Sequence, residues 1–145
     1  MKKRKITNPF DVKFKPFDNY GSPIKGMSWH KVTYSKKTGQ GTYILKMKPG
    51  ARSKLHRHTN FEEFLMLDGE LIDLDNKIFK KGDLVTFPPG SSHSSYTKNG
   101  CLIIVFMRAL NKVIKNNTKK FWKTLINMIG ILGGMGTQAG LDFCN

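Results

Sequence analysis

The sequence predicts an all-β sandwich or barrel, and three observations lead to this fold class. From residue 29 onward the chain consists of short segments rich in β-branched and aromatic residues. Pairs of turn-forming residues separate these segments about every 8–12 residues, which is typical of antiparallel sheets. No helical pattern lies between the segments. A parallel α/β sheet is therefore excluded, because its strands need helical crossovers.

About eight segments carry this strand pattern. In chain order they are WHKVTYS, GTYILKMK, KLHRH, EEFLMLDGELIDL, KIF, DLVTFPP, SSHSSY and CLIIVFMR. Turn pairs such as Pro49-Gly50 and Asn99-Gly100 lie between them. The last segment is continuously apolar, so we expect residues 101–107 to form a central strand covered on both faces.

Different patterns flank these strands. Residues 1–25 contain three prolines and no sustained period, which predicts an extended arm that packs Phe10, Phe14 and Phe17 against the body. Residues 26–108 form the predicted barrel, and residues 109–145 a predicted C-terminal helix and tail. The helix is predicted because Phe121, Leu125 and Ile129 recur at helical spacing, after Thr118 as a helix cap and before Gly130 or Gly133 as a stop.

Composition narrows the class of protein. The 145 residues suit one domain, and no apolar run reaches the ~20 residues of a membrane span. The basic N-terminus is not followed by an apolar run, so we expect no secretory leader, no membrane partner and a cytoplasmic protein. The two cysteines, Cys101 and Cys144, lie far apart, which indicates no disulfide framework.

The formal net charge is +15, which raises the question of a nucleic-acid partner. The positive residues are mostly scattered lysines, and only Arg4, Arg52, Arg57 and Arg108 are arginines. Base readout and bidentate phosphate recognition favour arginine. A lysine-, asparagine- and isoleucine-rich composition also arises in an AT-rich genome. We therefore expect no nucleic-acid partner.

The stretch HRHTNFEEF, residues 56–64, is either a metal site or a histidine-rich polar turn. On a strand, residues i and i+2 point to the same face, so His56 and His58 would project together while Arg57 points away. A carboxylate from the next strand could supply a third ligand. His93, just after FPPGSS, is the only later histidine and could supply a fourth.

Two longer motifs contain these residues and resemble a known family. GARSKLHRHTNFEEFLMLDG resembles the first cupin motif, G-x5-H-x-H-x3-E-x6-G, and GDLVTFPPGSSHSSYT resembles the second, G-x5-P-x-G-x2-H-x3-N. The resemblance covers about residues 26–108. The matching positions are Gly50, His56, His58, Glu62 and Gly69, and then Gly82, Pro88, Gly90 and His93. The second motif departs from the family at its last position, where Thr97 stands in place of asparagine.

The resemblance implies a fold and a ligand set. The fold would be a double-stranded β-helix, the jelly-roll barrel of small RmlC-like cupins. Its metal ligands would be His56, His58, Glu62 and His93, with one divalent ion that ligand chemistry leaves open between iron, zinc, manganese and nickel. Glu63 is an alternative to Glu62, although the spacing to Gly69 favours Glu62. A further alternative has only the three histidines on the metal, with Glu62 idle or acting on substrate.

Within the cupins, the sequence is similar to the zinc-binding cupin domain of ChrR-type anti-sigma factors. Those proteins also carry an N-terminal helical domain with its own zinc ligands, whereas residues 1–25 here contain neither histidine nor cysteine. Sigma-factor regulation is therefore not carried over. His30, next to Trp29 on the first clear strand, is interpreted as structural rather than as a ligand.

Three hypotheses for function remain. The first is metal-dependent, Fe(II) dioxygenase-like chemistry on a small oxygenated metabolite, which makes the protein an enzyme. The second is a non-catalytic, zinc-binding sensor of the ChrR type. The third is a sugar isomerase or epimerase working by acid–base catalysis. In each case we expect a small-molecule ligand in the barrel and a homodimer.

Overall fold

A computed structural model describes residues 1–115 of the chain, and these residues form β-strands joined by turns. The strands, in chain order, are β1 (Lys15–Pro16), β2 (Met27–Lys31), β3 (Gly41–Met47), β4 (His56–Arg57), β5 (Glu62–Asp73), β6 (Ile78–Lys80), β7 (Leu84–Phe87), β8 (Ser92–His93), β9 (Ser95–Tyr96), β10 (Cys101–Met107) and β11 (Lys112–Val113). The predicted all-β fold is confirmed. The predicted helix and tail, from Thr118 onward, lie outside the described residues.

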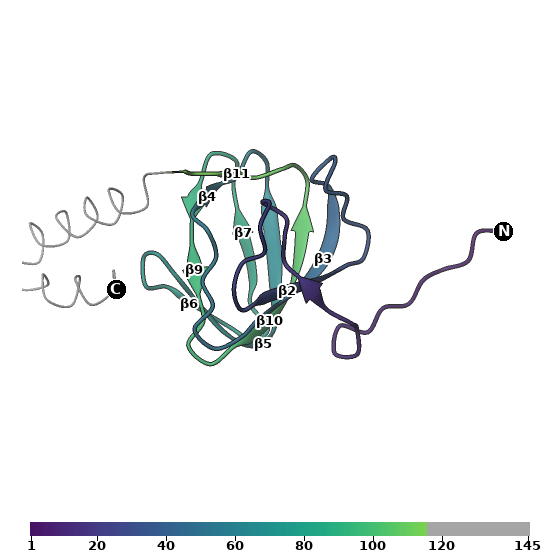
Figure 1. The fold of residues 1–145 in the computed structure, drawn as a ribbon, viewed down its shortest axis with the longest axis horizontal. Helices are drawn as coiled ribbons and strands as arrows, with labels where there is room; N and C mark the ends of the chain where they lie inside the picture. The colour runs from purple at the N-terminus through teal and green to yellow at the C-terminus, as the bar shows by residue number, and fades with distance from the viewer. Residues whose placement is uncertain (116–145) are drawn as a thin grey trace, which may run out of the picture. The chain divides into compact units, whose positions relative to one another are not determined.

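Two antiparallel sheets build the barrel (Figure 1). The larger sheet has the strand order β1-β2-β3-β10-β5-β6, with β7 and β9 also paired to β5. The smaller sheet has the order β11-β4-β8. Segment SSHSSY, expected as one strand, divides into β8 and β9, so that it contributes to both sheets.

The central position predicted for β10 is confirmed, because it pairs with β3 on one side and β5 on the other. Its inner residues, including Ile103 and Val105, are buried in the core. The expectation of cover on both faces is wrong at Phe106, which faces outward and is 40% exposed. No described strand or helix covers the outer face there, and a run of apolar letters could not reveal this.

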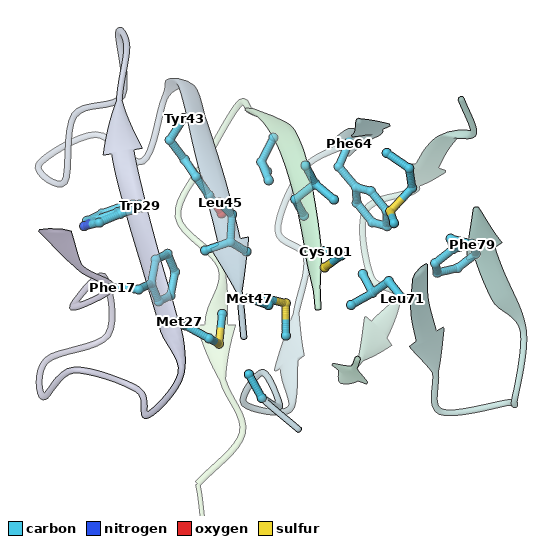
Figure 2. Packing of buried hydrophobic residues seen from close by; sticks show 14 of the residues in the cluster. Phe17, Met27, Trp29, Tyr43, Leu45, Met47, Phe64, Leu71, Phe79 and Cys101 are labelled. Carbon is cyan, nitrogen blue, oxygen red and sulfur yellow. The ribbon is translucent and has the colours of Figure 1, made fainter. Parts of the chain in front are cut away.

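The core lies on the inner face of the larger sheet and is rich in aromatic rings and methionines (Figure 2). Phe17, Trp29 and Tyr43 pack edge-on or tilted against one another with ring centroids 4.7–6.0 Å apart. Phe64 lies on the other side of the core, near Phe79. Burying such side chains stabilises a fold by ~1.5–3 kcal/mol each.

The N-terminal segment, residues 1–25, joins the barrel only in its second half. β1 pairs with β2, and Phe17 is fully within the core. Phe14 is half-buried beside the Nζ of Lys46, 5.5 Å from its ring, whereas Phe10 is 68% exposed. The packing expected of the arm therefore holds for Phe17, holds in part for Phe14 and fails at Phe10. The division into arm, barrel and tail stays a prediction.

Along strand β5, the residues that point into the barrel switch from even-numbered to odd-numbered positions. Even-numbered residues from 62 to 66 are buried, and Leu67 then has no partner on β10, where the register shifts. Gly69 follows in the left-handed region, with φ at 74°, and a Cβ there would clash with the backbone of β10. After this bulge Leu71 and Asp73 are buried. One strand thus serves both halves of the barrel.

Among residues 1–115, no helix has the length and apolar character that crossing a membrane requires.

Candidate metal centre

Four residues that the motifs single out converge inside the barrel. His56, His58, Glu62 and His93 are all buried, and each offers a ligand atom within 4.8 Å of the others. The three imidazole centroids lie 4.6–5.0 Å apart. His56 and His93 belong to the smaller sheet and Glu62 to the larger one, so the cluster joins the two sheets.

Backbone pairing brings the histidines together. In the smaller sheet His56 lies directly opposite His93, so both side chains leave the sheet on the same face. The Pro88-Pro89-Gly90 turn is closed onto the first motif, because the Gly90 amide donates to the His58 carbonyl at 2.8 Å. Gly90 has φ at 89°, which a residue with a side chain rarely adopts. The turn therefore holds the backbone of His58 in place.

Hydrogen bonds fix which nitrogen of each imidazole carries the proton. Nδ1 of His56 donates to the carbonyl of Lys54 at 2.7 Å. Nδ1 of His58 lies 2.9 Å from Oγ of Ser91. That hydroxyl already donates its one proton to the carbonyl of Pro88 at 2.6 Å, so it accepts from His58. In both rings the lone pair is therefore on Nε2.

A buried carboxylate orients the third histidine. Nδ1 of His93 donates to Oδ1 of Asp73 at 3.0 Å, and Oγ of Ser95 donates to the same oxygen at 3.1 Å. Asp73 is itself buried. A carboxylate behind an imidazole fixes its orientation and makes it a better electron donor to a metal. Asp73 was not among the predicted site residues, although an aspartate in the apolar stretch ELIDL was a sign of a buried, paired carboxylate.

The donor atoms fit a divalent cation. Nε2 of His56, His58 and His93 is buried in each case and has no hydrogen-bond partner among residues 1–115. Buried polar atoms normally have hydrogen-bond partners, so three converging nitrogen lone pairs without partners indicate a site for an electron-pair acceptor such as a metal ion. Oε2 of Glu62 lies 3.2 Å from Nε2 of His58, without hydrogen-bond geometry. Three imidazoles and one carboxylate suit zinc, iron, manganese or nickel.

The protonation states are those that metal binding requires. Burial, together with the charge of His93, lowers the pKa of His56 from 6.5 to about 4. Burial would raise the pKa of Glu62 and is the largest single influence. The contact with His58, the charge of His56 and a hydrogen bond from Asn111 together outweigh it and bring the pKa to about 2. At neutral pH the site thus offers a neutral His56 and an ionised Glu62.

The structure separates the two neighbouring glutamates. Glu62 is 6% exposed and accepts a hydrogen bond from Nδ2 of Asn111 at 2.6 Å. Glu63 points outward, where Oε1 accepts from Arg108 at 3.1 Å and Oε2 from Thr86 at 3.3 Å. Only Glu62 lies with the histidines. Asn111 follows the predicted barrel boundary, and nothing in the sequence motif pointed to it.

Two other residues occupy structural positions. His30 lies outside the cluster, where its Nδ1 donates to the carbonyl of Lys13 at 3.1 Å. Thr97, which stands where the cupin motif has asparagine, is fully buried. Its hydroxyl donates to the carbonyl of Glu70 at 2.7 Å and accepts from the amide of Gly100 at 3.0 Å. The threonine at this position therefore stabilises the turn before β10 and lies outside the cluster of candidate metal ligands.

A cavity of about 50 Å³ adjoins the cluster. A single water needs ~10–15 Å³, so the cavity accommodates only a small ligand. His56, Glu62 and His93 line it together with two serines, and most of the other lining side chains are apolar. Tyr20 and Tyr43 also line it. Burial and the charge of Glu62 raise the pKa of both phenols above the usual 10, so both keep their protons at neutral pH.

Comparison with known proteins identifies the family of the chain. The sequence model of the ChrR cupin-like domain matches residues 2–111, which is most of the chain. The chain belongs to the ChrR cupin-like domain family. This match extends beyond the 26–108 region of the motifs and includes the segments that carry Tyr20 and Asn111. Among curated protein sequences, none matches the chain.

Solved structures share the cupin fold. An RmlC-like cupin protein from Ralstonia eutropha is 12% identical over 89% of this chain and 88% of its own, with a TM-score of 0.65. An acetylacetone dioxygenase from Acinetobacter johnsonii is 16% identical over 81% and 84%, with a TM-score of 0.61. The complex of Rhodobacter sphaeroides SigE with the anti-sigma ChrR gives 17% identity and a TM-score of 0.53, over 68% of this chain and only 50% of that chain. At these identities the likeness shows the fold alone.

Proposed function

We propose that this ChrR-like cupin binds one divalent metal ion through His56, His58, Glu62 and His93 and uses it for Fe(II) dioxygenase-like chemistry on a small oxygenated molecule. The observation that carries the proposal is the set of three orphaned, buried Nε2 atoms converging beside an ionised carboxylate. The solved acetylacetone dioxygenase of the same fold supports the choice of reaction class.

The residues of the chain would divide the work as follows. The three imidazoles and Glu62 hold the ion, and their hydrogen-bonded Nδ1 atoms keep the lone pairs aimed at it. A metal bound there supplies a Lewis acid or an oxygen-activating centre. The apolar cavity walls exclude water and admit a small organic molecule with its polar end toward the metal. They offer few partners for the many hydroxyls of a sugar, so we do not extend the proposal to sugar isomerisation.

Elemental analysis tests the metal site. Protein purified without added metal or chelator is compared with the His56→Ala, His58→Ala double variant and with His30→Ala, a histidine outside the cluster. We expect about one equivalent of metal in the wild type and in His30→Ala, and none in the double variant. Equal metal contents in all three proteins would contradict the assigned ligands.

Oxygen uptake tests the reaction. The iron-loaded wild type is assayed against a panel of small β-diketones and phenolic compounds, with the double variant as the control. Oxygen consumption that depends on both iron and one compound supports an enzyme. Intact iron loading with no uptake across the panel would contradict the dioxygenase proposal.

A second candidate is a non-catalytic, zinc-binding sensor. The match to the ChrR cupin-like domain favours it, because that family is named after an anti-sigma factor. It predicts about one equivalent of zinc in the elemental analysis, no oxygen uptake, and a change of oligomeric state or partner binding when a ligand is added. The two measurements above therefore also decide between these two functions.

We propose that the protein works as a homodimer. An apolar row crosses the outer face of the larger sheet, because Leu84 on β7 pairs with Leu65 on β5, which pairs with Ile104 on β10. Leu84 is 60% exposed, and contiguous exposed apolar groups mark association surfaces. Light scattering coupled to gel filtration is expected to give a dimer for the wild type and a monomer for Leu84→Glu.

A further inference from the structure

The cavity beside the metal cluster has two phenol groups in its wall. Tyr20 belongs to the loop between β1 and β2, and Tyr43 belongs to β3. Both rings are held in place by neighbouring rings. Tyr20 lies 5.9 Å from Phe17 and 6.1 Å from His56, and Tyr43 lies 5.3 Å from Trp29. Packed rings of this kind fix the direction of a hydroxyl more firmly than a flexible side chain would.

The loop that presents Tyr20 is itself braced. The Ile24 amide donates to the carbonyl of Phe17, and the Phe17 amide donates to that of Met27, both at 3.1 Å, which closes the base of the loop. Next to Tyr20, Oδ1 of Asn19 accepts from the hydroxyl of Tyr34 at 2.9 Å. The position of the Tyr20 hydroxyl is therefore set by the fold and not by a freely moving arm.

The groups around Tyr20 leave its hydroxyl proton without an acceptor. Nδ2 of Asn111 donates one hydrogen to Oε2 of Glu62 at 2.6 Å and lies 3.3 Å from the Tyr20 oxygen, to which it donates the other. The Tyr20 oxygen therefore acts as an acceptor toward Asn111. The side chain of Asn19 also interacts with the Tyr20 hydroxyl. Burial raises the pKa of this phenol, whereas Asn19, like Asn111, lowers it, as a hydrogen-bond donor does. The hydrogen bonds of residues 1–115 therefore do not include an acceptor for the Tyr20 proton.

The hydroxyl proton of Tyr43 also has no acceptor among the described residues. Its side chain is buried, at 3% exposure, yet none of the described residues forms a hydrogen bond with its hydroxyl. Tyr34 differs, because its proton is already given to Asn19 and it does not line the cavity. Tyr20 and Tyr43 both line the cavity beside the metal cluster and each has a proton to donate, so a ligand with acceptor oxygens would find two hydrogen-bond donors there.

We propose that Tyr20 and Tyr43 are positioning residues that donate hydrogen bonds to the oxygen atoms of a small carboxylate or enolate-type anion bound in the cavity beside His56 and Glu62. This inference rests on the proposed metal function and names the ligand class for the same site. A divalent ion held by three neutral imidazoles and one carboxylate keeps a net positive charge, which favours an anionic ligand. The apolar walls limit the rest of the molecule to a short hydrocarbon body.

The test uses acetate and azide, two small anions that fit the cavity, as probes on the full-length, metal-loaded protein. Their dissociation constants are measured by calorimetric titration for the wild type, Tyr20→Phe, Tyr43→Phe and the matched control Tyr34→Phe. One neutral hydrogen bond changes a binding constant by about three- to tenfold. We expect acetate affinity to fall by this factor in Tyr20→Phe and in Tyr43→Phe and to stay unchanged in Tyr34→Phe. The metal content should be the same in all four proteins.

Other outcomes overturn the inference in distinguishable ways. If the metal is retained and acetate binds with equal affinity to the wild type and to both variants, the phenols do not contact the ligand, while the metal function stands. The same holds if neither anion binds the metal-loaded wild type. If Tyr34→Phe loses as much affinity as the other two, the effect is a general disturbance of packing. If the wild type holds no metal, the proposed function fails and this inference fails with it.

Discussion

The larger and the smaller sheet hold their polar residues in different ways. In the larger sheet, β10 pairs with β3 and β5 over seven residues each, and this long register sets the position of Glu62. In the smaller sheet each strand has two residues, and its histidines depend on side-chain hydrogen bonds from Nδ1. From this difference we predict that the larger sheet forms the stable frame, whereas the smaller sheet depends for its stability on a metal bound at the proposed site.

The largest effect should come from the frame. Phe64→Ala removes a side chain that contacts Phe79 and Phe87 in the core, so the free energy of unfolding should fall by ~3–5 kcal/mol. Phe106→Ala removes the same side chain from the outer face of the same sheet and should cost less than ~1 kcal/mol. Urea denaturation of both variants measures the two losses. Similar losses would mean that an interface covers the outer face.

Metal removal should act on the smaller sheet. A ligand at about 100 times its dissociation constant stabilises a protein by ~2.7 kcal/mol, so chelation should lower the unfolding midpoint by a corresponding amount. Amide hydrogen exchange should accelerate in β4 and β8 and stay unchanged in β3 and β10. The His56→Ala, His58→Ala protein should show no response to chelator. Equal acceleration in both sheets would remove the distinction between them.

Acid should destabilise the metal-free protein through His56. Its pKa is about 4 in the folded state against an ordinary 6.5, so the unfolded state binds more protons between these values and stability rises with pH. The contribution is complete above pH 6.5 and is lost as the pH falls toward 4. Between pH 7 and pH 5 the loss is ~2 kcal/mol. Glu62, with a pKa of about 2 against 4.5, adds a further loss only below pH 4.5.

Urea denaturation of the metal-free protein at pH 7 and pH 5 measures this dependence. His56→Gln should flatten it, and His30→Gln should leave it unchanged. A wild-type slope that survives in His56→Gln would assign the pH dependence to other groups.

The smallest effect should come from the carboxylate behind His93. Asp73→Asn keeps an acceptor oxygen for Nδ1 of His93 but removes the charge. Loss of such a partner typically weakens metal binding by at least about tenfold, equivalent to ~1.4 kcal/mol. Competition with a chromophoric chelator measures the affinity. Asp75→Asn, which changes an exposed aspartate on the next turn, should leave it unchanged.

Much of this site was predictable from the sequence, because spacing within one or two strands decides it. His56 and His58 are two residues apart, and the bulge glycine Gly69 favoured Glu62 over Glu63 as the inward residue. Their convergence with His93 required the resemblance to the cupins, since nothing local in the sequence states that β4 lies opposite β8.

The residues that prediction missed are those that meet the site through the folded chain. Tyr20 lies in a segment interpreted as an arm, and Asn111 follows the expected end of the barrel. Asp73 reaches His93 only because β5 changes face, which no alternating pattern reveals. Phe106 shows the opposite error, where apolar sequence was interpreted as burial on both faces.

The bulge in β5 decides which way Asp73 faces. Side chains alternate along a strand, so the odd-numbered Asp73 faces inward with the even-numbered Glu62 only because Leu67 is passed over in the pairing with β10. A chain without Leu67 would pair as a regular strand and keep both carboxylates inward. A chain that kept Leu67 but paired every residue with β10 would keep Glu62 in place and turn Asp73 away from His93. The partner of one histidine thus depends on whether a single leucine, six residues earlier in the chain, is left unpaired.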